Sequence, residues 1–465
     1  MLLRLLTVGT ATLLLTFPSQ PVSANPVSVI AQAEDGDAAD LLETQNEADS
    51  ADTDEPAEGP PLDAVDQIIL TGLDQYENRN LVEAKTTLEQ ALEAARANEN
   101  LAQESFSLTL LGLITVNQGD YGTASDYAQK ALQALEDVDD PQSTVIALNV
   151  LALSTQAQGN LPDAINYGQE ALKLAQEIEF NAGGLNSLSI LATSYRTVGQ
   201  YSLALEAAQL AIPLAQSERN GQALLSALNV ASSSLLALEQ NETALTAAQD
   251  AVTVATELDN QPGRALALSN LGVAQYRLGS LDDAIETQTE VLELAQAVGP
   301  LDVQFTALYV LALAHYDKGD VDTAVDFYQR HLALSRESEA VGAELQALLG
   351  LSSAYLDDGQ YENAIAAFDD LLALSEERNQ PVFQSLSLSG LGFANVQLQN
   401  YPIAQEHLEQ ALVIAKDLGD RDAEYGLLSL LAEVHQAQNN TEQAQDYAAQ
   451  AAALQPAETE TAPEE

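Results

Sequence analysis

Residues 268–292, LSNLGVAQYRLGSLDDAIETQTEVL, contain the pattern that decides the fold. Leu268 and Leu271 are followed by a small residue, and spacings of three and four place such side chains on one face of a helix. Gly279 then ends this helix, because glycine adopts the left-handed conformation at little cost, and the polar Ser280 can cap a second helix. The stretch therefore predicts two helices joined by a tight turn.

The same pattern recurs along the chain with a constant period. One position holds alanine in all ten repeats: Ala84, Ala124, Ala164, Ala204, Ala244, Ala284, Ala324, Ala364, Ala404 and Ala444. A leucine recurs with the same period between these alanines: Leu108, Leu148, Leu188, Leu228, Leu268, Leu308, Leu348, Leu388 and Leu428. A fixed period of this length, filled by helical spacing, indicates a solenoid of stacked helix pairs. No unit buries a core alone, so neighbouring units must stabilise one another.

Prolines support the same division of each unit. Pro162 and Pro402 fall in the first turn of a second helix, where the missing N–H costs nothing. Four more fall in the joints between units: Pro141, Pro262, Pro300 and Pro381. Pro213 falls inside a second helix, at a cost of about 3 kcal/mol, and predicts a kink. The fifth unit has Ala231 in place of leucine and Glu239 in place of the turn glycine, so we expect the least regular stacking there.

These units resemble the tetratricopeptide repeat, in its extended 40-residue form. The resemblance rests on Leu271-Gly272, Tyr276, Gly279, Leu281, Ala284 and Val291-Leu292 in one unit, and on Leu111-Gly112, Gly119, Tyr121, Ala124 and Ala131 in another. It implies an all-α fold, a right-handed superhelical α-solenoid of about ten helix-turn-helix repeats over residues 62–455. In the family that the chain resembles, the first helix of each unit lines a concave groove that holds peptides or helices of partners.

Both ends of the chain differ in composition from the repeats. Residues 1–24 contain one arginine and then thirteen mainly apolar residues, followed by small residues up to Ala24. This order predicts a secretory signal peptide cleaved after Ala24, with a retained anchor as the alternative. Residues 25–61 and 456–465 are acidic and poor in large apolar residues, so we expect a disordered linker and a disordered tail. The sequence thus predicts an exported protein, in a periplasm, a lumen or the extracellular space.

The charge of the chain excludes two classes of partner. The formal net charge is −54, from 70 Asp and Glu against 16 Lys and Arg. Nucleic acids and anionic membrane surfaces both require cations on the protein, so we expect neither to bind. A protein or peptide segment with Lys or Arg around an apolar centre is favoured instead. Because the chain has no cysteine, disulfides, thiolate metal sites and cysteine nucleophiles are also excluded.

The sequence contains no catalytic or metal-binding motif. Its four histidines, His315, His331, His407 and His435, are too far apart for a local metal motif. It has no phosphate-binding loop, no dinucleotide turn and no nucleophile elbow. Carboxylate pairs such as Asp357-Asp358 indicate a solvated acidic face. A weak calcium site is the alternative, and it is less favoured because the regular oxygen spacing of a calcium loop is missing. We therefore expect no enzyme activity, no cofactor and no metal.

The candidate binding residues lie on the first helices, one, five and eight residues after the repeated leucine, and share a helix face. They form an apolar and aromatic stripe: Val273, Tyr276, Tyr309, Leu313, Tyr316, Leu349, Leu356, Phe393 and Val396. Leu113 and Val116 continue it near the other end, whereas the middle is polar: Ser189, Thr193, Arg196, Asn229 and Ser233. The alternative is that these side chains pack between the first helices of adjacent units.

Taken together, these features predict an exported, non-enzymatic scaffold that binds a partner segment, apolar with basic flanks, in the groove. Members of the family that clamp an acidic peptide terminus use Lys, Arg and Asn side chains in the groove. Few such residues are available here: Arg196, Arg277, Asn149, Asn229 and Asn270. The alternative function is an envelope protein that binds a small molecule, a glycan or a cation. Neither the partner's identity nor the oligomeric state follows from the sequence.

Overall fold

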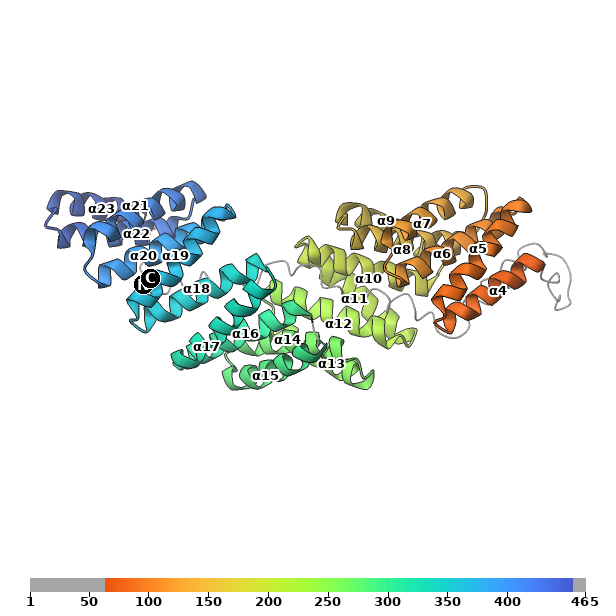
Figure 1. Ribbon diagram of the computed structural model, residues 1–465, viewed down its shortest axis with the longest axis horizontal. Helices are drawn as coiled ribbons and strands as arrows, with labels where there is room; N and C mark the ends of the chain where they lie inside the picture. Colours follow the sequence, from red (N-terminus) through yellow and green to blue (C-terminus); the bar gives the residue numbers. More distant parts are fainter. Residues whose placement is uncertain (1–62, 299, 455–465) are drawn as a thin grey trace, which may run out of the picture. The chain divides into compact units, whose positions relative to one another are not determined.

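The computed structural model describes residues 63–298 and 300–454. The predicted signal peptide, linker and tail therefore lie outside the described residues. Within the described ranges, twenty α-helices follow one another without a strand, which confirms the predicted all-α solenoid (Figure 1). None of these helices is both long enough and apolar enough to cross a membrane.

The helices alternate between first and second helices of ten units. The first helices are α4 (Ala64–Glu77), α6 (Leu101–Asn117), α8 (Pro141–Ala157), α10 (Asn181–Thr197), α12 (Gly221–Ala237), α14 (Gln261–Arg277), α16 (Leu301–Asp317), α18 (Val341–Asp357), α20 (Pro381–Gln397) and α22 (Arg421–Ala437). The second helices are α5 (Leu81–Ala97), α7 (Tyr121–Leu135), α9 (Leu161–Glu177), α11 (Tyr201–Ser217), α13 (Asn241–Glu257), α15 (Leu281–Val298), α17 (Val321–Glu337), α19 (Tyr361–Glu377), α21 (Tyr401–Leu418) and α23 (Thr441–Leu454). The described residues form two compact parts, an N-terminal part that ends at Ala274 and a C-terminal part that starts at Gln275.

The turn inside each unit has the predicted left-handed residue. Gly119 and Gly279 have φ angles of 77° and 80°. Where glycine is replaced, Glu239 and Gln399 adopt the same conformation, each with a φ of 59°. The fifth unit keeps two regular helices, α12 and α13, that pack against each other, and α12 also packs against α10 and α11 of the fourth unit. The turn geometry is imposed by the packing of the two helices, and it holds even where the residue is unfavourable.

The prolines occupy helix starts more often than joints. Pro141 and Pro381 are the first residues of α8 and α20, and Pro262 is the second residue of α14. The prediction placed these residues between units, but the helices begin at or before them, because the first turn does not use the missing N–H. Pro213 lies on the exposed side of α11, which continues as an α-helix to Ser217.

The small residues of the repeat form the centre of each unit. The first nine alanines of the repeated column, Ala84 to Ala404, are all 0% exposed, and the tenth, Ala444, is 5% exposed. Such burial lets the backbones of the two helices approach closely, while leucines fill the space beside them. The core of this protein is therefore a row of interfaces between helix pairs.

Matched pairs of residues, one on a second helix and one on the next first helix, set the fit between units. On two second helices an alanine shares a core cluster with a valine of the next first helix: Ala128 with Val150, and Ala208 with Val230. Where the second helix carries a large aromatic residue, the next first helix carries glycine: Tyr328 with Gly350, and Phe368 with Gly390. A Cβ atom on either glycine would lie 2.2 Å from the facing ring, so these sites accept glycine alone without rearrangement.

Candidate binding face on the first helices

The apolar stripe of the C-terminal part divides into buried and half-buried residues. Tyr309 and Leu356 are each only 3% exposed and belong to one core cluster. The ring of Tyr309 meets the ring of Tyr328 edge-on, with 6.0 Å between the ring centroids. Val273, in the N-terminal part, is 5% exposed. The side chains of Val273, Tyr309 and Leu356 pack between helices, as the alternative interpretation stated, and offer a partner almost no surface.

Leu349 is likewise buried, at 1% exposed, and the other five predicted residues are half-buried: Tyr276, Leu313, Tyr316, Phe393 and Val396. Leu313, Tyr316 and Phe393 pack against the same core cluster. Leu313 and Tyr316 lie on α16 and Phe393 lies on α20, on either side of α18. We call this surface the first-helix face and define it by Leu313, Tyr316, Asp317, Ser353, Asp357, Phe393 and Val396. Asp317 on α16 and Asp357 on α18 occupy equivalent repeat positions, and Ser353 lies one turn before Asp357. The face combines apolar side chains with carboxylates at its margin.

Tyr276 is fixed by a hydrogen bond to the next first helix. Its hydroxyl donates to Oδ2 of Asp317 at 2.9 Å. Burial, together with the charge of Asp317, raises the pKa of Tyr276 well above its usual value, so the hydroxyl stays a donor at neutral pH. This bond holds the carboxylate of Asp317 in one place at the margin of the first-helix face.

Asp357 lies in an unusual environment on α18. It is exposed to solvent, yet loss of surrounding water raises its pKa to about 6. Both observations fit a carboxylate that water reaches from one side while protein atoms surround it on the others. The hydroxyl of Ser353, one turn earlier on the same helix, is buried and has no hydrogen-bond partner among the described residues. A positive charge placed here would favour the ionised form of Asp357.

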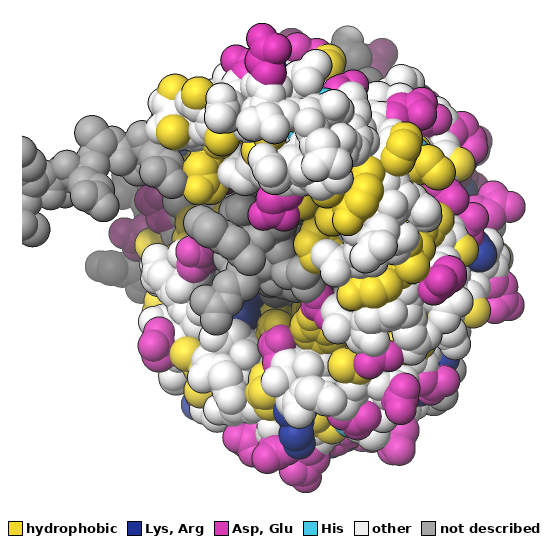
Figure 2. All heavy atoms as spheres, turned by 90° about the vertical axis from the view of Figure 1, so that its left-hand side faces the viewer, with side chains coloured by type: hydrophobic (Ala, Val, Ile, Leu, Met, Phe, Trp, Pro, Cys, Tyr) yellow, Lys and Arg dark blue, Asp and Glu magenta, His cyan; other side chains and the backbone are white. Residues whose placement is uncertain are grey.

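Nearby basic residues are already paired with carboxylates. Lys318 binds Asp282, and Arg336 binds Glu344 and Asp370 at 2.7 and 3.0 Å. Figure 2 shows the end of the C-terminal part formed by the last helices, where acidic side chains are abundant and Lys and Arg are few. The surface therefore presents mainly uncompensated negative charge.

Two asparagines that could have bound a peptide terminus are used inside the N-terminal part. The amide of Asn149 donates to the carbonyl oxygen of Gly183 at 2.9 Å and accepts from Ser187 at 2.8 Å. The amide of Asn270 donates to the hydroxyl oxygen of Ser232 at 2.9 Å. These bonds join neighbouring first helices, so the side chains stabilise the stack.

His331 is a feature that the sequence did not single out. It is 0% exposed on α17, and neither ring nitrogen has a hydrogen-bond partner among the described residues. The ring lies 5.4 Å from that of Phe305 and 6.0 Å from that of Tyr309, measured between centroids. Burial lowers its pKa to about 4. In the part of the chain that the structure describes, no group of three or more His, Asp or Glu side chains could hold a metal ion.

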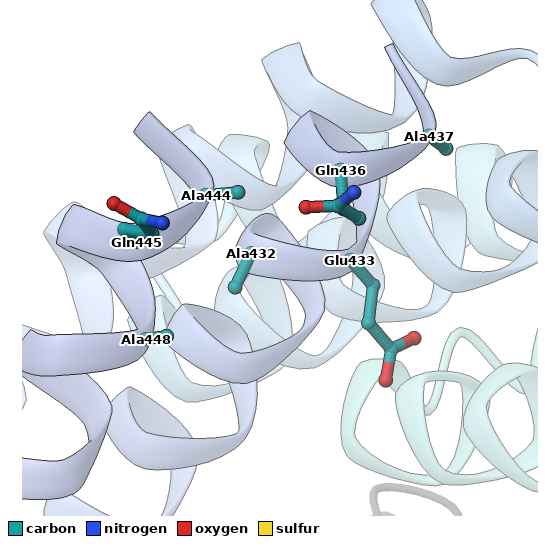
Figure 3. A pocket seen from close by; sticks show the side chains of 7 residues that line it. All are labelled: Ala432, Glu433, Gln436, Ala437, Ala444, Gln445 and Ala448. Atoms are coloured by element: carbon teal, nitrogen blue, oxygen red, sulfur yellow. The ribbon is translucent and has the colours of Figure 1, made fainter. Parts of the chain in front are cut away.

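A hollow of about 550 Å³ in the last unit was also missed from the sequence. Figure 3 shows it between α22 and α23. It is lined by Ala432, Glu433, Gln436, Ala437, Ala444, Gln445 and Ala448. We call it the terminal hollow. The signal that could have revealed it is the repeat itself, because the positions of Ala444 and Ala448 are fully buried in the second unit, where Ala124 and Ala128 occupy them.

Comparisons with known proteins agree with the repeat assignment. The family model of the tetratricopeptide repeat matches residues 143–217, 223–297, 303–377 and 383–457. The apo form of RapI has a similar fold, with a TM-score of 0.56 and 12% identity over 77% of this chain and 99% of RapI. A signal transduction ATPase with a tetratricopeptide repeat sensor, from Pyrococcus horikoshii, has a TM-score of 0.59 and 13% identity over 97% of this chain and 68% of its own. These identities support the fold alone. The search of curated proteins returned no match.

Proposed function

The chain belongs to the tetratricopeptide repeat family, and from that premise we propose that it is a non-enzymatic scaffold that binds a segment of a partner protein. The binding surface is the first-helix face of the C-terminal part. One observation carries this proposal: half-buried Leu313, Tyr316 and Phe393 pack against one core cluster, and α16 and α18 also carry the exposed carboxylates of Asp317 and Asp357. Aromatic residues with apolar bodies are enriched among residues that anchor protein interfaces.

The charge of the face favours a segment with an apolar centre and basic flanks. A Lys or Arg side chain that approaches Asp357 would lower its raised pKa and favour its ionised form, and Asp317 is already held in place by Tyr276. The net charge of −54 attracts such a segment over distance and repels an acidic one. Association should therefore slow as salt is added, because ions screen this attraction beyond about 10 Å at 0.1 M.

Truncating two anchors of the face is expected to weaken binding. The partner is first captured by a photo-crosslinking residue at position 316 in the native host, then identified and purified. We expect Tyr316→Ala combined with Phe393→Ala to raise the dissociation constant of the purified complex at least about tenfold, which corresponds to about 1.4 kcal/mol. Isothermal titration calorimetry measures this change.

Tyr355→Ala is the matched control for this experiment. Tyr355 lies on α18, but its hydroxyl accepts a bond from Gln329 of the second helix α17 at 3.0 Å, so it faces away from the first-helix face. The control should bind like the unaltered protein. If Tyr355→Ala weakens binding and the double variant does not, while circular dichroism shows both folded, the partner occupies another surface.

We also propose that the protein is exported after cleavage following Ala24. The basic residue, apolar run and small residues at positions 1–24 support this proposal. Intact-mass spectrometry of the protein purified from its native host should give a chain that begins at Asn25. A mass that still includes Met1 in most molecules would instead identify the segment as a retained anchor.

A further inference from the structure

The alanine floor of the terminal hollow has the same place in its unit as a surface that is buried in the second unit. Ala432, Ala444 and Ala448 occupy the repeat positions that Gly112, Ala124 and Ala128 occupy in the second unit. The other four lining residues are equivalent to Leu113, Val116, Asn117 and Ser125. All seven positions therefore have counterparts in the second unit.

In the second unit, helix α8 occupies this place. Val150 of α8 reaches within 3.1 Å of the point where a Cβ atom on Gly112 would lie. It packs in one core cluster with Val116, Ala124 and Ala128. The terminal hollow thus lies where a further first helix would pack, over Ala432, Ala444 and Ala448.

Five of the seven lining positions differ between the terminal hollow and its inner counterpart, and two of these changes replace an apolar residue with a polar one. Glu433 replaces Leu113, and Gln436 replaces Val116, so the alanine floor acquires a polar and negative margin. In Figure 3 the side chain of Glu433 extends from α22 away from Ala444 and Ala448, at the edge of the hollow. A helix that fits here needs an apolar residue at its centre and a cation near Glu433.

We propose that the terminal hollow docks an amphipathic α-helix of a partner protein, with one branched apolar side chain and a Lys or Arg about one turn away. This site is separate from the first-helix face and does not depend on the function proposed for it. A second copy of the chain is the less favourable occupant, because each copy carries a net charge of −54. Its own first helix, α4, would also bring the acidic Asp66 and Asp74 towards Glu433.

The test uses a peptide that copies the helix seen over the inner counterpart. The probe is a peptide with the sequence of α8, residues 141–157, stapled on the side opposite Val150. It carries Leu153→Lys, because Leu153 belongs to the cluster against which Leu113, the counterpart of Glu433, packs. Fluorescence anisotropy with the full chain should show saturable binding. The protein variant Ala448→Leu fills the hollow and should weaken binding at least about tenfold. Ala453→Leu adds the same side chain at an exposed position of α23 and should leave affinity unchanged.

Two altered peptides test the chemistry of the occupant. Val150→Asp in the probe removes the apolar centre, and Glu in place of Lys at position 153 reverses the charge. Each should bind at least about tenfold more weakly than the probe. The proposal is overturned if the full chain fails to bind the probe at about 1 mM, or if Ala448→Leu binds it normally. It is also overturned if sedimentation velocity of the protein alone shows a dimer that Ala448→Leu abolishes, because the occupant is then a second copy.

Discussion

Phe368→Ala is expected to lower the free energy of unfolding of the C-terminal part by about 3 to 5 kcal/mol. Phe368 is fully buried on α19, and its ring fills the space left by Gly390 on α20. Removing the ring leaves a cavity that the helices cannot close without moving. The change is measured by urea unfolding followed by circular dichroism.

The partner substitution should be unfavourable alone and favourable in combination. Gly390→Val places atoms within 2.2 Å of the ring of Phe368, and overpacking of a core costs about 1 to 3 kcal/mol. Combined with Phe368→Ala, the same valine recreates the pair formed by Ala128 and Val150. We therefore expect the double variant to be more stable than the sum of the single changes predicts, by about 1 to 3 kcal/mol.

Gly342→Val provides a matched control on α18. A Cβ atom at Gly342 would have no neighbour within 4 Å, so the substitution should change stability by no more than about 0.5 kcal/mol. If the effects of Phe368→Ala and Gly390→Val simply add, the two residues do not fit together as the structure describes.

Acid should destabilise the protein through His331. Below pH 6.5 this histidine takes up a proton in the unfolded chain, whereas in the folded protein it stays neutral until about pH 4. Unfolding then binds a proton, so stability falls as the pH falls through this window. With 1.36 kcal/mol for each pH unit of the shift, the loss between pH 6.5 and pH 4 is about 3 kcal/mol.

The measurement compares His331→Leu with the unaltered protein. Leucine fits, because Leu371 occupies the equivalent position of the next unit and is fully buried. The difference in unfolding free energy should grow by about 3 kcal/mol in favour of the variant between pH 7 and pH 4. Titration of the carboxylates affects both proteins and cancels in the comparison. A difference that stays constant with pH would show that His331 takes up its proton at the same pH in the folded protein as in the unfolded chain.

The helices could be predicted from the sequence because each unit repeats the same local signals. Gly279 ends a helix, Ala284 allows close approach, and the constant period fixes every other unit once one is understood. Even Glu239 keeps the left-handed turn, since two packed helices impose it. Local chemistry and tertiary packing agree almost everywhere along the chain.

The binding face was predicted only in part, because exposure depends on neighbouring units. Tyr309 and Tyr316 lie on the same side of one helix, but helices packed against α16 bury the first and leave the second half-exposed. The raised pKa of Asp357 and the burial of His331 likewise arise from the packing of neighbouring helices around these side chains. Periodicity shows which residues share a face, and the stack decides which of them meet solvent.

The matched pairs that join successive units constrain how such a protein can evolve by duplication. Tyr328 and Gly350 belong to different units, as do Phe368 and Gly390. A gene segment that copies α16 and α17 next to itself would set Tyr328 against a copy of Val310 instead of a glycine. A segment that runs from one second helix through the following first helix carries its matched pair intact. The heritable module of this protein is therefore offset by half a repeat from its structural unit.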